Sequence, residues 1–469
     1  MTAAQQQIPV DVDAPAAGSR WTVVFFVAAI FVLLVTLGNP PVTRTQEARV
    51  LETSRQMLGT GWRGWTLPTL NGEPRLKKPP LAYWMTASAY LIGGVSEFVG
   101  RIPNAILGLC TLLATYLIAR RMLGHRIALA SAAALLGSHH FFKFVGQAET
   151  DTPAMLFLTI AIGSLWIAST DSRARWMHLA AAACGGSVLA KGAPAIFVLV
   201  FLLAFCWIEH RWDLLKRFII TGAPLTLLAI ALPWYLYAQQ HAGGSVFASE
   251  MSNTLRGGDH FDWPWVYIPW IFLAGAPWSL LLPLALYEPI RKWKSDPIGR
   301  FLLIWFGSIL IPLMINGNKQ SHYLLMLTPP MMILIARYLL SWRRMERAIP
   351  WLLASACIAM PLIIGVLMPS FTHPNSREVA SQIRDKFDDG PYVFFGENLS
   401  LPLCFNLRSA IPSVRTTEEL SQIATPKTVV IAQTKNGVAP PPLPQRFVHA
   451  LKIKTSEQTF DLYQQAPNP

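Results

Sequence analysis

The stretch WTVVFFVAAIFVLLVTLG, residues 21–38, decides the fold class of this chain because it is apolar throughout and contains no charged residue. A run of about 20 such residues is long enough for a helix to cross the hydrocarbon core of a bilayer. Ten further apolar runs follow, at approximately 103–119, 127–145, 153–169, 177–190, 192–208, 218–238, 265–286, 301–315, 322–340 and 349–369. The sequence therefore predicts a polytopic α-helical membrane protein.

The composition agrees with this fold class. Hydrophobic residues make up 52% of the 469 residues and charged residues only 14%, with a mean hydropathy of +0.37. Average soluble domains contain roughly 25% charged residues. A soluble multidomain protein, a disordered chain, a coiled coil and a collagen-like repeat are therefore excluded. The net charge of +13 does not indicate nucleic acid as a partner, because it lies mainly in short loops between the apolar runs.

Basic residues in alternate loops predict the orientation of the chain. Five short loops contain most of these residues, namely Arg120, Arg121, Arg126, Arg173, Arg175, Arg211, Lys216, Arg217, Arg291, Lys292, Lys294, Arg300, Arg337, Arg343, Arg344 and Arg347. Short loops rich in Lys and Arg stay in the cytoplasm. The pattern predicts a cytoplasmic N-terminus and an external C-terminal tail. This orientation requires that residues 81–98 do not cross the membrane. Whether 81–98 or the small-residue run 177–190 crosses stays open.

Three regions are expected along the chain. Residues 1–20 are small and polar and predict a disordered cytoplasmic lead. Residues 21–370 form the transmembrane domain, with a long external loop at 39–102 that carries juxtamembrane helices. Residues 371–469 alternate β-like runs at 392–395, 428–432 and 447–451 with helical stretches near 376–387 and 417–424. This alternation predicts a small external α/β domain, in which Pro440, Pro441 and Pro442 form a rigid turn or linker.

The first external loop is too long and too patterned to be a simple connection. Its sequence, TRTQEARVLETSRQMLGTGWRGWTLPTLNGEPRLKKPPLAYW (43–84), spaces Glu47, Arg49 and their neighbours as in a helix. An amphipathic helix on the outer leaflet explains most of this helical pattern. Asn71-Gly72 predicts a turn. Glu47 and Lys78 stand out because they lie where the chain leaves the lipid and where it returns to it.

Other ionisable residues lie at the external ends of predicted spans. These residues are Glu149 and Asp151 in QAETDTP, Lys191 in LAKGAP, and Lys319, His322 and Tyr323 in NKQSHY. Asp151 precedes Pro153 by two residues, so a helix N-cap is an alternative. Each lysine alone could reach lipid phosphates. Acids and lysines on one membrane face nevertheless suit chemistry on a lipid-linked substrate, with a carboxylate as base and ammonium groups binding a phosphate.

These motifs resemble those of the integral-membrane GT-C glycosyltransferases. QEARVLETSRQM, PTLNGEPRLKKPPLAYW, ETDTP, LAKGAP and NKQSHYLLMLTPP are similar to segments of the 4-amino-4-deoxy-L-arabinose lipid A transferases and of the dolichyl-phosphate-mannose-protein mannosyltransferase group. The resemblance covers roughly residues 20–345. It implies a GT-C-like fold with about 11 to 13 transmembrane helices. It also implies sugar transfer from a polyprenyl-phosphate donor to a lipid A-like or protein acceptor, on the periplasmic face of a bacterial inner membrane.

The resemblance implies a catalytic acid in the first external loop and matches Lys78 to the family's Lys-Pro motif. Together with the placement of the other residues, it gives the expected site. Glu47 and Asp151 are expected to be catalytic, Lys78, Lys191, Lys319 and Arg49 to bind the donor phosphate, and His322, Tyr323 and Glu149 to contact the substrate.

Two motif positions depart from the family's pattern. The family's first-loop motif begins Asp-Glu, whereas this chain has Gln46-Glu47, so the role of the missing acid falls on Glu47 or Asp151. In the lipid A transferases an acid before the Lys-Pro motif and a later His bind a metal. Here the first position is Lys77, and the region of Ser249–Met251 contains no His. No definite cofactor is therefore expected, and a divalent metal stays an alternative.

A transporter or flippase of a lipid-linked substrate is the rival function. Such a protein carries polar groups deep within several spans or in paired interrupted helices. The ionisable residues of this chain gather instead at one membrane face, which favours chemistry there. Membrane lipids, a lipid-linked donor and a lipid or protein acceptor are the expected partners.

Overall fold

The computed structural model describes residues 17–76, 78–241, 263–342, 347–371, 375–387, 390–396, 399–435, 442–455 and 458–465. The chain forms two compact units. The first comprises Met1–Leu37, Lys77–Ala82 and Arg101–Ile364, and the second comprises Gly38–Leu76, Tyr83–Gly100 and Gly365–Pro469. The long first loop thus falls largely into the same unit as the C-terminal tail.

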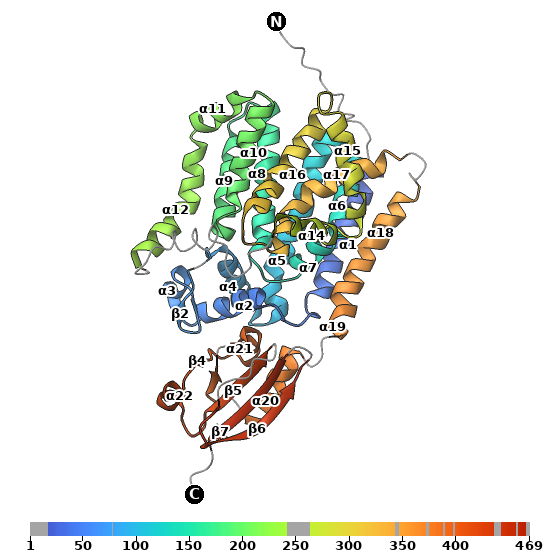
Figure 1. Ribbon diagram of the computed structural model, residues 1–469. Coiled ribbons are helices and arrows are strands. Elements are labelled where there is room, and N and C mark those ends of the chain that lie inside the picture. The colour runs from blue at the N-terminus through green and yellow to red at the C-terminus, as the bar shows by residue number, and fades with distance from the viewer. Residues whose placement is uncertain are drawn as a thin grey trace. The chain divides into compact units, whose positions relative to one another are not determined.

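Helices make up the first unit (Figure 1). They are α1 (Ala17–Thr36), the main part of α5 (Glu97–Leu123), α6 (His125–Leu136), α7 (His139–Val145), α8 (Asp151–Thr170), α9 (Arg175–Lys191), α10 (Ala195–Ile208), α11 (Trp212–Ile220), α12 (Ala223–His241), η1 (Pro264–Val266), α14 (Tyr267–Ala274), η2 (Trp278–Leu281), α15 (Leu282–Arg291), α16 (Pro297–Ile315), η3 (Ser321–Leu327), α17 (Thr328–Leu340) and α18 (Ile349–Met360). The π-helical turn η5 (Pro361–Leu367) follows α18 and continues into α19 (Met368–Ser370).

Five described helical segments are long and apolar enough to cross a membrane, or up to seven if each bent pair is one span. Three shorter apolar helices, Arg20–Thr36, His125–Leu136 and Ala195–Ile208, coincide with further predicted spans. The polytopic helical fold is thereby confirmed. Helix α4 (Leu81–Gly93), in the segment expected not to cross, is not among these candidates, and neither is α9.

Several predicted spans are broken in the structure. The run 127–145 divides into α6 and α7 at Gly137 and Ser138. The run 218–238 bends by 62° between α11 and α12, next to Gly222 with its φ of +75°. The run 265–286 bends by 117° between α14 and η2. Each of these runs was expected to be one continuous span, and glycine or proline lies at or beside each break. The expected disorder of residues 17–20 is wrong, because α1 begins at Ala17.

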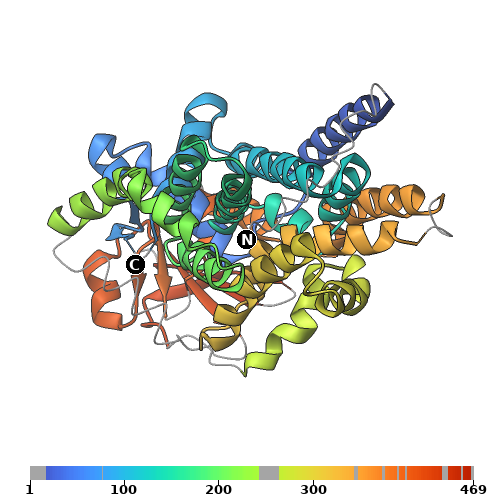
Figure 2. The same ribbon diagram turned by 90° about the horizontal axis from the view of Figure 1, so that it is seen from above.

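Small residues let α9 approach its neighbours closely, as expected for 177–190. A Cβ on Gly186 would lie 2.9 Å from the Phe157 ring of α8, and one on Gly185 would lie 3.0 Å from Ile230 of α12. Small residues at such contacts let neighbouring helices approach each other closely in lipid. Figure 2, which looks from above, shows this teal-to-green group of helices side by side. The close packing fixes the end of α9 beside the start of α8.

The second unit contains the external loop. Its elements are α2 (Thr45–Met57), α3 (Gly61–Thr66), β1 (Thr69–Leu70), β2 (Glu73–Pro74) and α4. The predicted turn at Asn71-Gly72 is confirmed, since both residues have positive φ (54° and 84°) and join the antiparallel strands β1 and β2. This is the conformation that the Asn-Gly pair favours in two-residue hairpins.

The α/β character of the tail is also confirmed. The tail contains α20 (Ser376–Phe387), β3 (Tyr392–Phe395), α21 (Leu401–Leu407), β4 (Ser413–Val414), α22 (Thr417–Ile423), β5 (Val429–Lys435), β6 (Phe447–Lys454) and β7 (Gln458–Gln465). The strand order is β4-β3-β5-β7-β6, parallel from β4 to β5 and antiparallel from β5 to β6. The short helix α21 and the strands β4 and β7 were not predicted. Pro440 and Pro441 lie outside the described residues.

The external loop and the tail are joined by hydrogen bonds. The Asn71 side-chain amide donates to the Ile411 carbonyl at 3.2 Å, and the Arg377 guanidinium donates to the Gly38 carbonyl at 2.7 Å. Loop and tail therefore lie on the same side of any membrane that the chain crosses. This agrees with the even number of crossings predicted between them.

Candidate functional site

Four elements of the first unit meet where the sequence predicted an external site. They are α7, the first turn of α8, the last turn of α9 and the 3-10 helix η3, which pack on one another through α8 and η3. Lys191 is the last residue of α9 because Gly192 follows it with a φ of +75°, a conformation that favours glycine. The helix end thus places the Lys191 side chain beside the start of α8.

A buried ion pair joins Asp151 of α8 to Lys191 of α9. Asp151 is 2% exposed and Lys191 is 6% exposed. The Lys191 ammonium also lies 4.2 Å from the centre of the Tyr323 ring. His322 and Lys78 are further electrostatic neighbours of the Asp151 carboxylate. Buried charges are costly unless they are paired, so this group is held as a set of mutually dependent residues.

Asp151 is not a simple helix cap. Thr150 occupies the N-cap position of α8 and makes no side-chain cap hydrogen bond, whereas Asp151 is the first helical residue. Its carboxylate accepts a hydrogen bond from Lys191. The sequence Asp-Thr-Pro begins α8, and the side chain of Asp151 reaches across to Lys191 of α9.

Lys319 has a different environment from Lys191. Its ammonium donates to the carbonyl oxygens of Leu313 (3.0 Å) and Met314 (2.8 Å), and also to that of Asn316. These are carbonyls at the C-terminal end of α16, which attract a positive charge. The ammonium also lies 5.6 Å from the centre of the Tyr267 ring. Lys319 therefore caps the C-terminal end of α16. Phosphate binding by this lysine stays a prediction.

Glu149 and a histidine pair border the group. Glu149 is buried, and its backbone carbonyl accepts a hydrogen bond from Asn104 at 2.9 Å. In α7, His140 approaches the Ser321 carbonyl with its Nε2 at 3.1 Å, and its Nδ1 lies 3.0 Å from that of His139. The two histidines were not singled out in the sequence. The adjacent pair within the apolar run GSHHFFKF is the signal that could have indicated them.

The second unit contains Glu47 and Arg49, both on α2. Glu47 is buried, at 1% exposure. Burial, and then the positive charge of Arg75, hold the pKa of Arg49 below its ordinary value. Tyr83 is an electrostatic neighbour of both arginines. Two guanidinium groups so close together favour a bound anion, and Arg75 is a residue that sequence reasoning missed.

The structure thus brings together Lys78, Asp151, Lys191, His322 and Tyr323 in the first unit, and places Glu47 and Arg49 in the second. Within the described ranges, no group of three or more His, Cys, Asp or Glu side chains is arranged to hold a metal ion. Ser249–Met251, the segment considered for a metal ligand, lies outside the described residues.

Apolar helices long enough to cross a membrane, a mixed sheet in the tail and a group of buried charges define a multi-pass helical membrane protein with a GT-C-like fold. Residues 77–237 match the family model described as dolichyl-phosphate-mannose-protein mannosyltransferase. The chain is similar in sequence to an undecaprenyl phosphate-alpha-4-amino-4-deoxy-L-arabinose arabinosyl transferase of Pseudomonas fluorescens, with 28% identity over 340 residues. That alignment covers 69% of this chain and 58% of the relative.

An uncharacterized protein of Aquifex aeolicus is 30% identical over 324 residues, which cover 67% of this chain and 64% of that relative. The chain thus spans less than two thirds of the length of these relatives.

Solved structures show the same fold. The crystal structure of ArnT from Cupriavidus metallidurans bound to undecaprenyl phosphate has a TM-score of 0.80 at 19% identity, over 95% of this chain and 98% of that chain. The Archaeoglobus fulgidus oligosaccharyltransferase has a TM-score of 0.57 at 14% identity, over 84% of this chain and 64% of that chain. The tail, which carried little of the sequence resemblance, is therefore included in the common fold with ArnT.

Proposed function

We propose that this chain transfers a sugar from a polyprenyl-phosphate donor to a lipid A-like or protein acceptor. The reaction takes place at the periplasmic face of a bacterial inner membrane. The donor class follows from the relatives, whose name specifies an undecaprenyl phosphate-linked aminoarabinose, and from the ArnT structure with undecaprenyl phosphate. The structure of the chain itself supports the proposal through its fold and through the buried ionisable group of the first unit.

The reaction requires one bond to form and one to break. An acceptor oxygen attacks the anomeric carbon of the donor sugar, and the bond from that carbon to the phosphate oxygen breaks. The bonding electrons leave with the polyprenyl phosphate. If the acceptor is a hydroxyl, its proton passes to a carboxylate. Cationic side chains lower the barrier by stabilising the charge that develops on the leaving phosphate.

The geometry suggests separate roles for the two acids. A carboxylate that is ion-paired with an ammonium is a weak base, because the pair favours its charged form. Asp151 is therefore assigned to hold Lys191 in place, and Glu47 is assigned as the base. Lys78 and Lys191 are assigned to the donor phosphate, and His322 and Tyr323 to the walls of the substrate site.

The buried Asp151–Lys191 pair is the observation that carries the proposal. The test uses the full-length protein in nanodiscs, with undecaprenyl phosphate-linked 4-amino-4-deoxy-L-arabinose as donor and lipid A as acceptor. Mass spectrometry should detect lipid A that is heavier by one sugar residue, and Asp151→Asn should abolish this product. A protein acceptor is tested by comparing the envelope glycoproteins of cells with and without the chain.

Proteoliposomes distinguish the rival function. A flippase would move the lipid-linked sugar between leaflets without consuming it, and no glycosylated product would form with any acceptor. That outcome would refute the transferase proposal.

A fusion at the C-terminus tests the proposed orientation. A reporter that is active only in the cytoplasm should be silent there, whereas the same reporter after Lys216 should be active. An active C-terminal fusion would place the tail, and with it the external loop, in the cytoplasm.

A further inference from the structure

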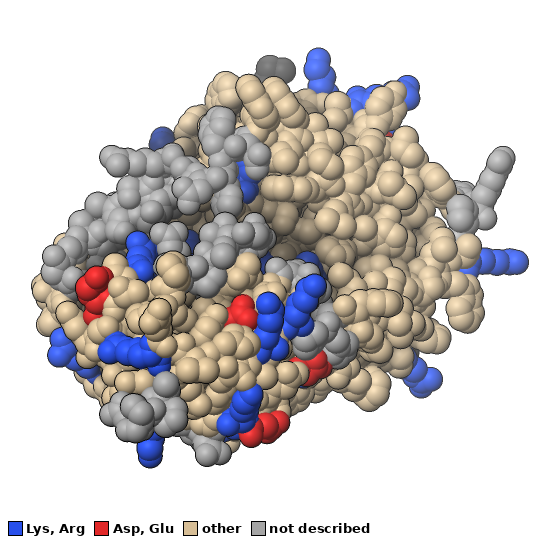
Figure 3. Space-filling view, turned by 60° about the horizontal axis from the view of Figure 1, so that its bottom comes forward, with Lys and Arg blue, Asp and Glu red and all other residues tan. Residues whose placement is uncertain are grey.

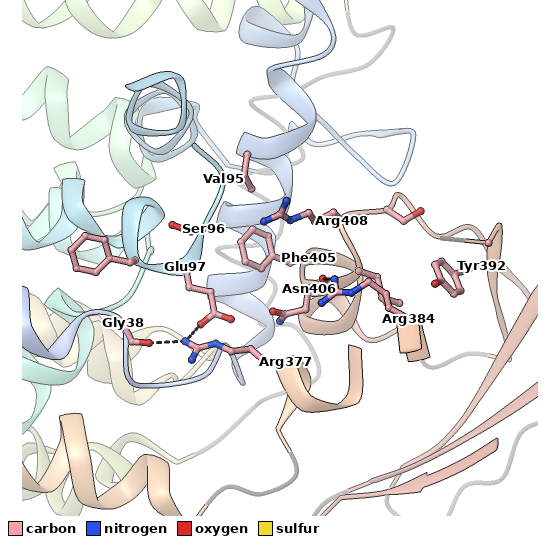
Figure 4. Close-up of a pocket in the computed structure, with 14 residues that line it drawn as sticks. Gly38, Val95, Ser96, Glu97, Arg377, Arg384, Tyr392, Phe405, Asn406 and Arg408 are labelled. Atoms are coloured by element: carbon pink, nitrogen blue, oxygen red, sulfur yellow. Dashed lines mark hydrogen bonds and ion pairs between the residues drawn. The ribbon is translucent and has the colours of Figure 1, made fainter. Parts of the chain in front are cut away.

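The second unit contains a cavity of about 920 Å³ to which no step of the proposed reaction has been assigned. Residues before and at the start of α5, 95–98, form one part of its lining. Residues of the tail, from α20, β3 and the end of α21, form the other. Figure 4 shows these side chains around the cavity. Its volume lies within the range of about 300–1,000 Å³ that is usual for small-molecule sites.

The charged side chains in the lining are three arginines and one glutamate, namely Arg377, Arg384, Arg408 and Glu97. Arg377 forms an ion pair with Glu97, as the dashed line in Figure 4 marks. The Arg377 guanidinium also donates to the Gly38 carbonyl at 2.7 Å. This pair leaves little net charge at that end of the cavity and connects the external loop to α20.

The other two arginines of the lining form no ion pair in the described part of the chain. Arg384 lies seven residues after Arg377 on α20, so both side chains extend from one face of the helix. Its Nη1 donates to the Asn406 carbonyl at 2.7 Å, the one hydrogen bond of this guanidinium in the described part of the chain. Arg408 follows α21 with a φ of 54° and is exposed. No described residue forms a hydrogen bond or an ion pair with its guanidinium. Both side chains therefore have donors available to a ligand.

We propose that this cavity binds a phosphate ester, with Arg384 and Arg408 as its charged ligands. Guanidinium groups present planar pairs of donors that match phosphate oxygens, and such charge-assisted hydrogen bonds are the strong ones. Figure 3 shows basic side chains, in blue, beside fewer acidic ones, in red, on the face that it views. The phosphate is carried either by the head group of a membrane lipid or by a soluble sugar phosphate. Binding is independent of the proposed transfer reaction.

The experiment has one arm for each source and uses the full-length protein in nanodiscs. In the soluble arm, glucose 1-phosphate is titrated calorimetrically into protein in phosphatidylcholine nanodiscs, with glucose as the uncharged reference. In the lipid arm, thermal unfolding is compared between nanodiscs with and without phosphatidic acid. The test variant is Arg384→Gln/Arg408→Gln. The matched control is Arg415→Gln, which removes an exposed arginine of the same tail that does not line the cavity.

Glucose 1-phosphate should bind to the wild type more tightly than glucose, or phosphatidic acid should raise the unfolding temperature. The double variant should weaken that binding by about 10-fold or more, or remove the temperature shift, since hydrogen bonds to charged groups are lost. Arg415→Gln should behave as the wild type. The proposal is overturned if neither probe binds, or if the control loses as much as the double variant. The unfolding temperature without ligand shows whether each variant is folded.

Discussion

The ammonium of Lys191 lies 4.2 Å from the centre of the Tyr323 ring. The two residues are far apart in the chain, at the end of α9 and in η3. Attraction between a cation and an aromatic face reaches about 2 kcal/mol when both are desolvated. Tyr323 therefore orients Lys191 from one side while Asp151 binds it from another.

This arrangement predicts that the ring of Tyr323 matters more than its hydroxyl. Tyr323→Phe should keep transfer close to the wild-type rate, because the aromatic face is retained. Tyr323→Leu should lower the rate by about 10-fold, the equivalent of roughly 1.4 kcal/mol. Initial rates in nanodiscs provide the measurement. Equal losses in both variants would instead assign the hydroxyl a role in binding the substrate.

The ion pair itself predicts a non-additive result. Asp151→Asn or Lys191→Met leaves one buried charge unpaired, which costs about 3–5 kcal/mol in stability. The double variant removes both charges and should unfold at a higher temperature than either single variant, although all three should be inactive. Thermal unfolding in nanodiscs measures the difference. A double variant whose loss is the sum of the two single losses would show that the residues act independently.

Lys78 is predicted to bind the donor phosphate as a compact charge. Lys78→Ala should reduce transfer by at least about 10-fold, the loss of one charge-assisted contact. Lys78→Arg should also be impaired, since a planar fork does not replace an ammonium at a close contact. The control is Lys216→Ala, which removes an exposed lysine of α11. A rate as low in the control as in Lys78→Ala would indicate a general effect of lost charge.

Glu47 is predicted to be the base. Glu47→Gln should lower the rate by about 10²–10⁴-fold while the protein stays folded. Glu52→Gln on the same helix is the matched control. Its carboxylate is buried and bonded to Arg55 and Gln56, so its loss should affect stability rather than chemistry. If Glu47→Gln stayed fully active, the proposed division of roles between Glu47 and Asp151 would have to be abandoned.

The buried thiol of Cys404 predicts that the stability of the folded tail depends on pH. Burial raises the pKa of this thiol from 9.0 to about 12. The folded state therefore favours the neutral thiol, and this contribution to stability is complete below pH 9 and is lost as the pH rises toward 12. Maleimide at pH 8 should leave Cys404 unlabelled until denaturant is added, whereas a thiol introduced by Glu418→Cys on the exposed face of α22 should react at once. Peptide mass spectrometry distinguishes the two. Comparable labelling of both in the folded protein would contradict the burial of Cys404.

Local patterns were sufficient where one segment determines its own structure. The strand β3 begins and ends at the predicted residues, and Asn71-Gly72 forms the predicted turn. The positions of helix breaks could not be predicted in the same way, because a glycine such as Gly137 or Gly222 is compatible with both a continuous helix and a break, and tertiary packing decides between them. The two-residue strand β4 is too short to show a period.

The candidate site was predictable as a set of residue types on one membrane face, but its pairings were not. Lys191 and Lys319 occur in similar positions at the ends of spans, yet one pairs with Asp151 and the other with three backbone carbonyls. This difference arises from the glycine that ends α9 and from the turn that follows α16. Arg75 escaped notice because its relevant neighbours, Arg49 and Tyr83, become close only after folding.

The hydrogen bond from Asn71 to Ile411 has a consequence for biosynthesis. A ribosome makes the hairpin long before it makes α20, α21 and β4, and all the remaining spans are inserted in between. During that interval the hairpin is complete while the residues that it will contact have not yet been synthesised. A chain that stops short of the tail thus exposes a finished hairpin with no surface to dock on, and quality-control proteases can recognise it as incomplete.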